Sequence, residues 1–416
     1  MPSYSLNIKR LRANLSELSK IGKIEGKAGI NRVSFSEEDM AGRDFLRRYM
    51  ENIGLESHMD GVGNVWGRWL PAQAREEKLP SVIIGSHLDT VPEGGEYDGA
   101  LGVLAGLEVV QSLQEQGFQP RIPLEILATS EEEGCFGGML GSQSLAGVVD
   151  ENWLETAQNQ QGVSLKDAMK RHGLDYKNAL SNTRPSETVK AFLELHIEQG
   201  PVLEQKKLSV GIVNAISGCA VWTICFEGRA DHSGTTPMDM RADAFVGAAG
   251  FSCAIPDIIG AVGTQESRLT IGKIEISPNY PHTIPGQASF SLVLRDTNET
   301  VMEKLANQCR STLKKLADEH GLSLSIKEIS WLSPASCSTE IVKLLQEEAD
   351  KGKIDHIIMS SGAGHDCQFM MNIAPSGLIF VPSKGGISHS RHEQTDWKDI
   401  EIGCRLLQNA AIRLCS

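Results

Sequence analysis

The pattern of apolar and polar positions divides the chain into parts that predict different architectures. In the first part, amphipathic helices expected over 8–21 and 37–53 precede a short apolar run, 82–84, that stops at Gly-Ser-His. A helical pattern follows over 99–116, and a second apolar strand over 124–129 also stops at polar residues. Strand, helix and strand in this order indicate an α/β fold with a mostly parallel sheet flanked by helices. In such sheets the chemistry gathers at the carboxyl ends of the strands.

Beyond residue 211 the pattern changes to alternating strands and longer helices. The expected order is strand 221–226, helix 241–254, strands 269–276 and 288–295, helix 300–320 and strand 322–329. This β-α-β-β-α-β order is the ferredoxin-like arrangement. We therefore predict an inserted lid domain over 212–327 within a catalytic domain formed by 1–211 and 328–416. The catalytic domain resumes with a strand over 378–381 and a final helix over 397–414.

Length and charge narrow the class of protein. A chain of 416 residues exceeds what one hydrophobic core usually supports, which agrees with two domains. The net charge of −13 disfavours nucleic acid or an anionic membrane as a partner, so an anionic substrate would need a specific arginine. The N-terminus lacks the apolar core of a signal peptide, and no stretch approaches the ~18 apolar residues of a membrane helix. We expect a cytoplasmic protein whose nine scattered cysteines are reduced thiols.

The first candidate site residues lie where the apolar run 82–84 ends. An extended backbone sends His87 and Asp89 to the same side. Metal-bound imidazole needs an acceptor that fixes its tautomer, and Asp89 could supply one. Taken alone the pair is weak evidence, because a histidine at a strand end is more often a structural residue.

Asp98 lies between glycines directly before the helix expected over 99–116. Aspartate caps helix N-termini well, so a structural role would explain it. Small neighbours would also let its carboxylate contact two cations at once. A bridging carboxylate explains how two cations could lie ~3.5 to 4 Å apart. The two interpretations are compatible.

Three consecutive glutamates, 131–133, follow the strand expected over 124–129. Such a run most often forms a solvated face. At the end of a buried strand, however, their repulsion is unfavourable unless positive charge offsets it, and a metal supplies that charge. Adjacent side chains diverge, so one glutamate could bind metal while its neighbour serves as general base.

Two further strand ends carry histidine. His196 ends an alternating strand and is followed by Gln199, a candidate substrate contact, and His389 follows the strand over 378–381. With His87, three histidines and several carboxylates should meet at one edge of one sheet. This set of nitrogen and oxygen ligands without cysteine fits Zn²⁺ or Mn²⁺.

Six segments in register resemble a known family. They are 85–106, Glu132-Glu133-Gly134, 196–204, 232–238, 361–366 and 386–393. Together they resemble the dinuclear-zinc carbamoyl-amino-acid hydrolases, which include N-carbamoyl-L-amino-acid hydrolase, allantoate amidohydrolase and β-ureidopropionase. That group falls within the aminoacylase and carboxypeptidase G superfamily. The resemblance covers nearly the whole chain.

The resemblance implies a role for each candidate. His87, Asp98 and His196 would bind one cation; Asp98, Glu133 and His389 the other; Glu132 would be the general base, and Asp89 the partner of His87. The cations would be Zn²⁺, with Mn²⁺ or Co²⁺ as alternatives. Gln199 stands where the peptidases have a carboxylate ligand, which points to the carbamoyl branch.

The resemblance also implies a substrate site that involves the lid. His232 would act as an electrophile in the neighbouring subunit's site, and Arg295 would clamp the substrate carboxylate; His282, Gly364 and His365 would also bind substrate. A homodimer through 212–327 follows. Two departures bear on the substrate: His282 stands where the family usually has asparagine, and the segment after Glu133 is shorter and lacks an arginine.

The expected function is hydrolysis of the carbamoyl C–N bond of N-carbamoyl-L-amino acids, small ureido substrates that carry a carboxylate. Allantoate or β-ureidopropionate hydrolysis is the first alternative. An aminoacylase or dipeptidase would use the same metals on an acyl amide. A relative that binds metal without turnover is disfavoured, because Glu132 would then have no water to activate.

Overall fold

The computed structural model describes residues 4–24, 26, 29–71 and 78–416. The chain forms two compact units. Unit 1 comprises Met1–Asn214, Cys337–Met359 and His365–Ser416, and unit 2 comprises Ala215–Ser336 and Ser360–Gly364. Unit 2 therefore extends past the expected end at residue 327, because its last strand continues to Leu332, and it gains a short second segment.

Unit 1 is built on a sheet with a parallel centre. The strands of this sheet are β1 (Glu56–Met59), β2 (Val65–Trp69), β3 (Ser81–His87), β4 (Leu124–Thr129), β5 (Val189–Ile197), β6 (Val210–Ile216), β12 (Ala335–Ser336), β13 (His356–Ser361) and β14 (Ser376–Val381). Strand β12 and the last residues of β6 and β13 fall within the bounds of unit 2. The order is β1-β2-β4-β3-β5-β14-β6-β12, with β13 paired to β6. The four central strands β4, β3, β5 and β14 are parallel, and the pairs β1–β2, β2–β4, β14–β6 and β6–β12 are antiparallel.

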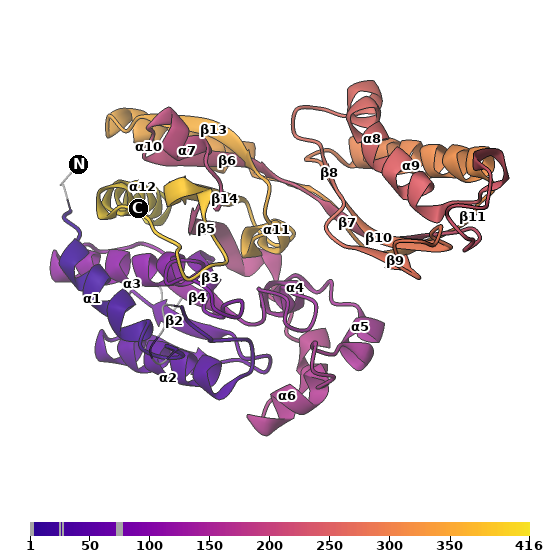
Figure 1. Cartoon of the computed structure of the whole chain (residues 1–416). Helices are drawn as coiled ribbons and strands as arrows, with labels where there is room; N and C mark the ends of the chain where they lie inside the picture. Colours follow the sequence, from indigo (N-terminus) through magenta and orange to yellow (C-terminus); the bar gives the residue numbers. More distant parts are fainter. Residues whose placement is uncertain (1–3, 25, 27–28, 72–77) are drawn as a thin grey trace. The chain divides into compact units, whose positions relative to one another are not determined.

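Unit 1 also contains helices, several of which pack on this sheet. They are α1 (Ile8–Leu18), α2 (Glu37–Asn52), α3 (Ala100–Glu115), α4 (Leu140–Ala146), α5 (Glu151–Thr156), α6 (Leu165–Arg171), α7 (Val202–Lys206), α10 (Thr339–Lys351), α11 (Asp366–Met370) and α12 (Trp397–Cys415). Helices α3 and α12 pack on the central strands, and α1 packs on α3 (Figure 1). Strand β5 is buried at every position except Lys190, so its expected alternation of exposed and buried residues is absent. The reason is that α12 and α11 both pack on β5.

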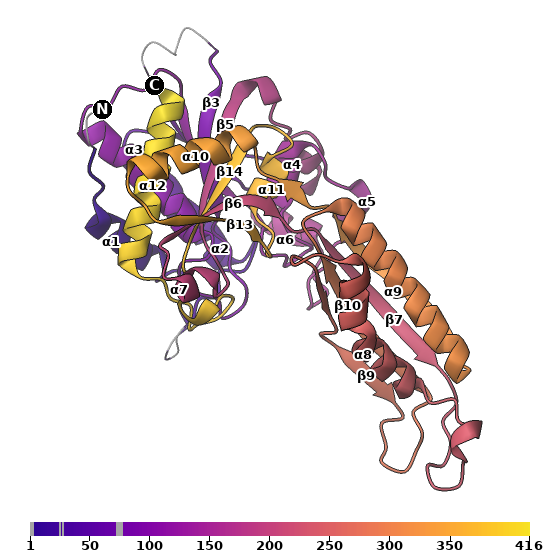
Figure 2. The ribbon, with the colours of Figure 1, turned by 90° about the horizontal axis from the view of Figure 1, so that it is seen from above.

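Unit 2 has the ferredoxin-like order. Strands β7 (Cys219–Glu227), β8 (Arg268–Thr270), β9 (Ile274–Ser277), β10 (Gln287–Arg295) and β11 (Ser323–Leu332) combine with α8 (Ala244–Val262) and α9 (Glu299–His320). The sheet order is β11-β7-β10-β8, and β9 also pairs with β10. The strand expected over 269–276 is thus two short strands. Alternate residues of β7 and β10 are buried, including Trp222 and Phe290, and both helices pack on this sheet (Figure 2).

Helix α8 corrects one expectation. Among the described helices it alone is long and apolar enough to pass a test for a membrane span, with 19 residues and a mean hydropathy of 1.7. The sequence therefore does contain an apolar stretch of that length. The helix includes Pro256 and places Ala248 and Phe251 in the core of unit 2, while only 22% of its apolar window is buried.

Candidate metal centre

The carboxyl ends of the central parallel strands bring the expected ligands of unit 1 together. His87 is the last residue of β3 and pairs in register with Thr129, the last residue of β4, after which the acidic run begins. His196 lies near the end of β5 and pairs with Phe380 of β14. His389 follows β14 on a loop. Parallel strands thus place residues from distant parts of the chain at one edge.

The cluster consists of two ligand groups that share Asp98. In the first, Asp98 Oδ1 lies 3.5 Å from His87 Nε2 and 3.0 Å from His196 Nε2. In the second, Asp98 Oδ2 lies 3.4 Å from His389 Nε2, which is 3.2 Å from Glu133 Oε2. The two oxygens of one carboxylate therefore face different groups, as a bridging ligand requires.

Hydrogen bonds to main-chain carbonyls orient the two buried imidazoles. His87 Nδ1 is 3.0 Å from the carbonyl oxygen of Asp89, and His196 Nδ1 is 2.8 Å from that of Ile197. Each Nδ1 must carry a proton to donate there. The Nε2 atoms face Asp98, and in the neutral ring each would offer its lone pair to a cation, the arrangement that metal-bound histidines show.

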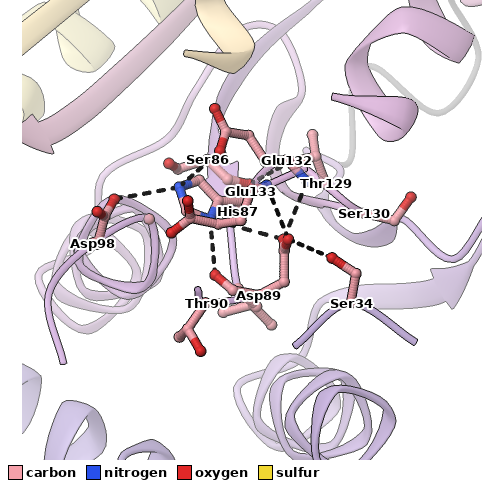
Figure 3. Close-up of polar contacts among 12 residues, drawn as sticks. Ser34, Ser86, His87, Asp89, Thr90, Asp98, Thr129, Ser130, Glu132 and Glu133 are labelled. Carbon is pink, nitrogen blue, oxygen red and sulfur yellow. Dashed lines mark hydrogen bonds and ion pairs between the residues drawn. The ribbon is translucent and has the colours of Figure 1, made fainter. Parts of the chain in front are cut away.

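Asp89 acts differently from what the sequence suggested. Its carboxylate lies 3.8 Å from His87 Nδ1, so the close partner of this histidine is the Asp89 carbonyl. The carboxylate instead accepts the hydroxyl of Ser34 at 2.7 Å and the backbone N–H groups of Glu132 and Glu133 at 3.3 and 3.1 Å (Figure 3). Asp89 thereby holds the backbone of the acidic run as well as contacting His87.

Electrostatics in the cluster favour an added cation. Burial raises the pKa of Glu132 well above its usual value, opposed by His87 and reinforced by Glu133. Burial and the Asp98 carboxylate likewise raise the pKa of Glu133. Burial would also raise the pKa of Asp98, but His196 and His87 more than offset this and lower it well below its usual range. Several buried carboxylates within a few ångströms are stabilised by divalent positive charge.

Gln199 gives a separate indication that the site holds a ligand. Its Nε2 donates to Asp98 Oδ2 at 3.0 Å and lies 3.3 Å from His389 Nε2. Its Oε1 is buried and has no hydrogen-bond partner in the described part of the chain. A buried amide oxygen without a partner is costly, so a ligand at this position would relieve the cost.

A third possible ligand group, Glu194, His196 and His365, fits a metal less well. The Glu194 carboxylate already accepts the hydroxyl of Ser86 at 2.8 Å and the backbone N–H of Cys367 at 2.9 Å. His196 is shared with the first group. The ring of His365 packs edge-on against His196 at 4.5 Å, and burial lowers the pKa of His365, so that it is neutral. We interpret Glu194 and His365 as structural residues that hold His196 of the first ligand group in place.

Comparison with known proteins settles the family. The model of peptidase family M20/M25/M40 matches residues 83–413. This chain belongs to that family. Its members are metal-dependent hydrolases, and the two ligand groups around Asp98 agree with that chemistry.

Relatives of this M20-family chain include amidohydrolases along its full length. It is 36% identical to an N-carbamoyl-L-amino acid amidohydrolase of Geobacillus stearothermophilus, over 97% of this chain and 98% of the relative. It is 33% identical to an allantoate amidohydrolase of Bacillus subtilis, over 93% of each chain. A solved amidase of the hydantoinase/carbamoylase family from Burkholderia multivorans superposes with a TM-score of 0.90 at 31% identity, covering 100% of this chain and 99% of the other.

Four expected substrate residues of this M20-family chain belong to unit 2. His232 is exposed, and its Nδ1 accepts the backbone N–H groups of Gly234 and Thr235 at 3.0 and 3.2 Å. The ring proton of the neutral form must therefore lie on Nε2, which leaves an outward donor. His282 is its neighbour, because His232 bridges to Thr283 and the His282 carbonyl accepts the N–H of Ser233 at 3.1 Å.

Arg295 and Gly364 are near one another within unit 2. Arg295 lies at the end of β10, and its Nη1 donates to the carbonyl of Gly362 at 2.9 Å. Gly364 closes the same short segment, 360–364. His365, the next residue, belongs to unit 1 and packs against His196.

Several carboxylates and hydroxyls around the cluster had no role in the site expected from the sequence. Ser388 and Glu393 hydrogen-bond Asp98. Ser34 donates to the Asp89 carboxylate, and Glu131 accepts the backbone N–H of Phe136. Three of them lay inside segments already singled out, since Glu131 begins the run 131–133, Ser388 precedes His389 and Glu393 closes the segment 386–393. A buried glutamate four residues after a candidate ligand was the available signal.

Proposed function

We propose that this chain is a metal-dependent amidohydrolase that cleaves the carbamoyl C–N bond of N-carbamoyl-L-amino acids and releases CO₂ and ammonia. The observation that carries the proposal is the placement of the two Asp98 oxygens against separate ligand groups, with the Glu132 carboxylate 3.7 Å from His87 Nε2. The carbamoyl specificity is supported by the relative from Geobacillus stearothermophilus, which is 36% identical along its length.

The centre would hold two divalent cations. His87 and His196 with Asp98 would hold one, and His389 and Glu133 with Asp98 the other. Nitrogen and oxygen donors without thiolate suit Zn²⁺, with Mn²⁺ and Co²⁺ as alternatives. Bound cations would polarise the ureido carbonyl, a poor electrophile, and lower the pKa of an attacking water.

The chain's own residues would move the proton. Glu132 lies beside the first ligand group, and its backbone N–H is held by Asp89. Its carboxylate would accept one proton from the attacking water and return it to the leaving nitrogen. Such transfers contribute about 10²-fold to 10⁴-fold in rate.

Binding of the substrate carboxylate and stabilisation of the oxyanion would come from unit 2. Arg295 offers a guanidinium that pairs with carboxylate, and His232 offers an outward Nε2–H donor. We propose that His232 serves the site of a second copy in a homodimer formed through 212–327. The nine free cysteines support a reducing, cytoplasmic setting, with neither nucleic acid nor membrane as partner.

A panel of substrates tests the reaction. N-carbamoyl-L-amino acids should release ammonia fastest, N-acyl amino acids should not be cleaved at comparable rates, and allantoate is the second candidate because of the 33% identical Bacillus subtilis relative. Exhaustive chelation should abolish turnover, and added Zn²⁺, Mn²⁺ or Co²⁺ should restore it. Full activity after chelation would exclude the proposed centre, and faster turnover of acyl amino acids would place the enzyme with aminoacylases.

A further inference from the structure

We propose that Glu393 is a positioning residue that holds Asp98 between the two ligand groups by binding the backbone of the loop that carries it. The proposal rests on the metal centre of the proposed function and gives a role to a residue outside the two ligand groups. Glu393 lies four residues after His389, and 295 residues separate it from Asp98.

The contacts of Glu393 are with the backbone of the Asp98 loop. Glu393 Oε1 accepts the N–H of Tyr97 at 3.0 Å and the N–H of Asp98 at 3.1 Å. Glu393 Oε2 lies 3.1 Å from Ser388 Oγ, which is 2.9 Å from Asp98 Oδ2. Glu393 is 5% exposed, so no solvent competes for these donors. One side chain thus meets both the backbone and, through Ser388, the carboxylate of Asp98.

The loop is shaped to admit this carboxylate. A Cβ atom on Gly95 would lie 2.1 Å from Glu393 Oε1 and 2.3 Å from its Cδ. Atoms cannot approach so closely, so the glutamate occupies the space that a side chain at position 95 would need. Glycine at position 95 therefore provides the space in which the Glu393 carboxylate binds the loop.

The fixed position of this loop matters because a bridging carboxylate must have one orientation. Two consecutive N–H groups bound to one oxygen fix the peptide plane before Asp98, and Ser388 limits rotation of its carboxylate. Without Glu393 the N–H groups of Tyr97 and Asp98 lose their partner, which is unfavourable for donors shielded from water and allows the loop to shift. A shift of the loop would move both Asp98 oxygens, and with them both ligand groups.

The test measures metal affinity directly. Chelated protein is titrated with Zn²⁺ by calorimetry, with a competing chelator, for wild type, Glu393→Ala, Glu393→Gln and Gly95→Ala. Glu393→Ala should weaken binding by roughly 10 to 100-fold, as is usual for residues that orient ligands. Glu393→Gln keeps an oxygen for the two N–H groups and should stay within a few-fold of wild type. Gly95→Ala should resemble Glu393→Ala although every carboxylate is retained.

Glu96→Gln is the matched control, because it removes an exposed carboxylate from the same loop. It should bind Zn²⁺ as wild type does. Equal losses of Zn²⁺ affinity in Glu96→Gln and Glu393→Ala would mean that the loss of negative charge, and not positioning, is responsible. Wild-type affinity in both Glu393→Ala and Gly95→Ala would refute the positioning role and leave the proposed function intact. If wild type itself binds no metal, the proposed function fails together with this inference. Gly95→Ala and Glu393→Gln keep the test decisive if Glu393→Ala does not fold.

Discussion

At the residue scale, the acidic run shows how surroundings give three identical side chains different tasks. Glu131 adopts a positive φ of 56° and turns its carboxylate away, toward the backbone N–H groups of Phe136 and Gly138 at 2.5 and 3.0 Å. Glu132 lies 3.7 Å from His87 Nε2, and Glu133 lies 3.2 Å from His389 Nε2. The first glutamate supports the loop, and the next two face the candidate centre.

Substitution of Glu132 and of Glu133 should distinguish the general base from the metal ligand. Glu132→Gln should keep both cations and bind substrate but lower kcat at least ~10²-fold, because the proton acceptor is lost. Glu133→Gln should lose one cation per chain, which elemental analysis after gel filtration would show. If the two variants exchange these properties, the roles within the run are reversed.

The first glutamate should make stability depend on pH. Burial raises the pKa of Glu131 to about 8, although two backbone N–H groups oppose this. Between the ordinary pKa of 4.5 and about 8 the folded protein keeps a proton that the unfolded chain releases. The free energy of unfolding of chelated protein should therefore fall as pH rises through this window, by up to ~1.4 kcal/mol per pH unit.

Glu131→Gln should weaken that dependence, since an amide does not titrate. Urea unfolding at pH 5, 6, 7 and 8 with a chelator present would measure it, with Glu96→Gln as the exposed control. Parallel curves for wild type and Glu131→Gln would contradict the raised pKa.

At the element scale, the turn between β3 and α3 determines the geometry of the first ligand group. Gly99 has a φ of 64° and begins the helix directly after Asp98. A Cβ atom at this position would lie 2.4 Å from Cε1 and Nδ1 of His87. The glycine is required both for its backbone conformation and for the space that the imidazole occupies.

Gly99→Ala should therefore lower stability and metal affinity together. Gly117→Ala is a matched control at the other end of the same helix, because its φ is 73° and nothing lies within 4 Å of its Cβ position. Both variants place a Cβ at a positive φ, which costs a residue in the left-handed region about 1 to 2 kcal/mol. The ψ of −57° puts Gly99 outside the left-handed helical region, so its backbone is the less favourable of the two for alanine. Only Gly99→Ala should lose Zn²⁺ affinity in calorimetry, and an equal loss in both would show that strain, not displacement of His87, is responsible.

The elements were predictable to different degrees. Strand β4 has the bounds expected from the sequence, and α2 and α12 end within one residue of them. Strands β1, β2, β6, β12 and β13 and helices α4 to α7, α10 and α11 were not predicted. Most are short. Strand β1 pairs with its sequence neighbour β2, but the other strands among them pair with strands far away in the sequence, which local periodicity does not record.

At the scale of the whole molecule, each unit has its own apolar core, so unit 2 can carry functional residues on an independent scaffold. The exposed ring of His232, with its outward Nε2–H, is such a residue. An unpaired strand edge offers N–H and C=O groups that can pair with another chain. These features agree with the proposed homodimer in which His232 of one chain serves the site of another.

Complementation between inactive variants would test that arrangement. His232→Ala and Glu132→Gln should each be inactive alone, and mixing them with subunit exchange should restore activity. A heterodimer would contain one site with both wild-type residues, so it should reach about half of wild-type activity. As a control, each variant is taken through the same subunit-exchange procedure alone and should stay inactive. Heterodimers that form but stay inactive would place His232 in its own chain's site or in none.

The sequence by itself determined the types of donor and their places at strand ends, because spacing and apolar runs are local properties of the chain. Those places predicted that the candidate ligands meet at one edge of a sheet, and the resemblance to a known family implied the two groups around Asp98 whose residues the fold brings together. Only the tertiary structure decided which atom faces which. The Asp89 carboxylate turned to the backbone of the acidic run, and Glu393 bound the Asp98 loop across 295 residues of sequence. Hydrogen-bond direction depends on segments that meet only when the chain is folded, and no local pattern encodes it.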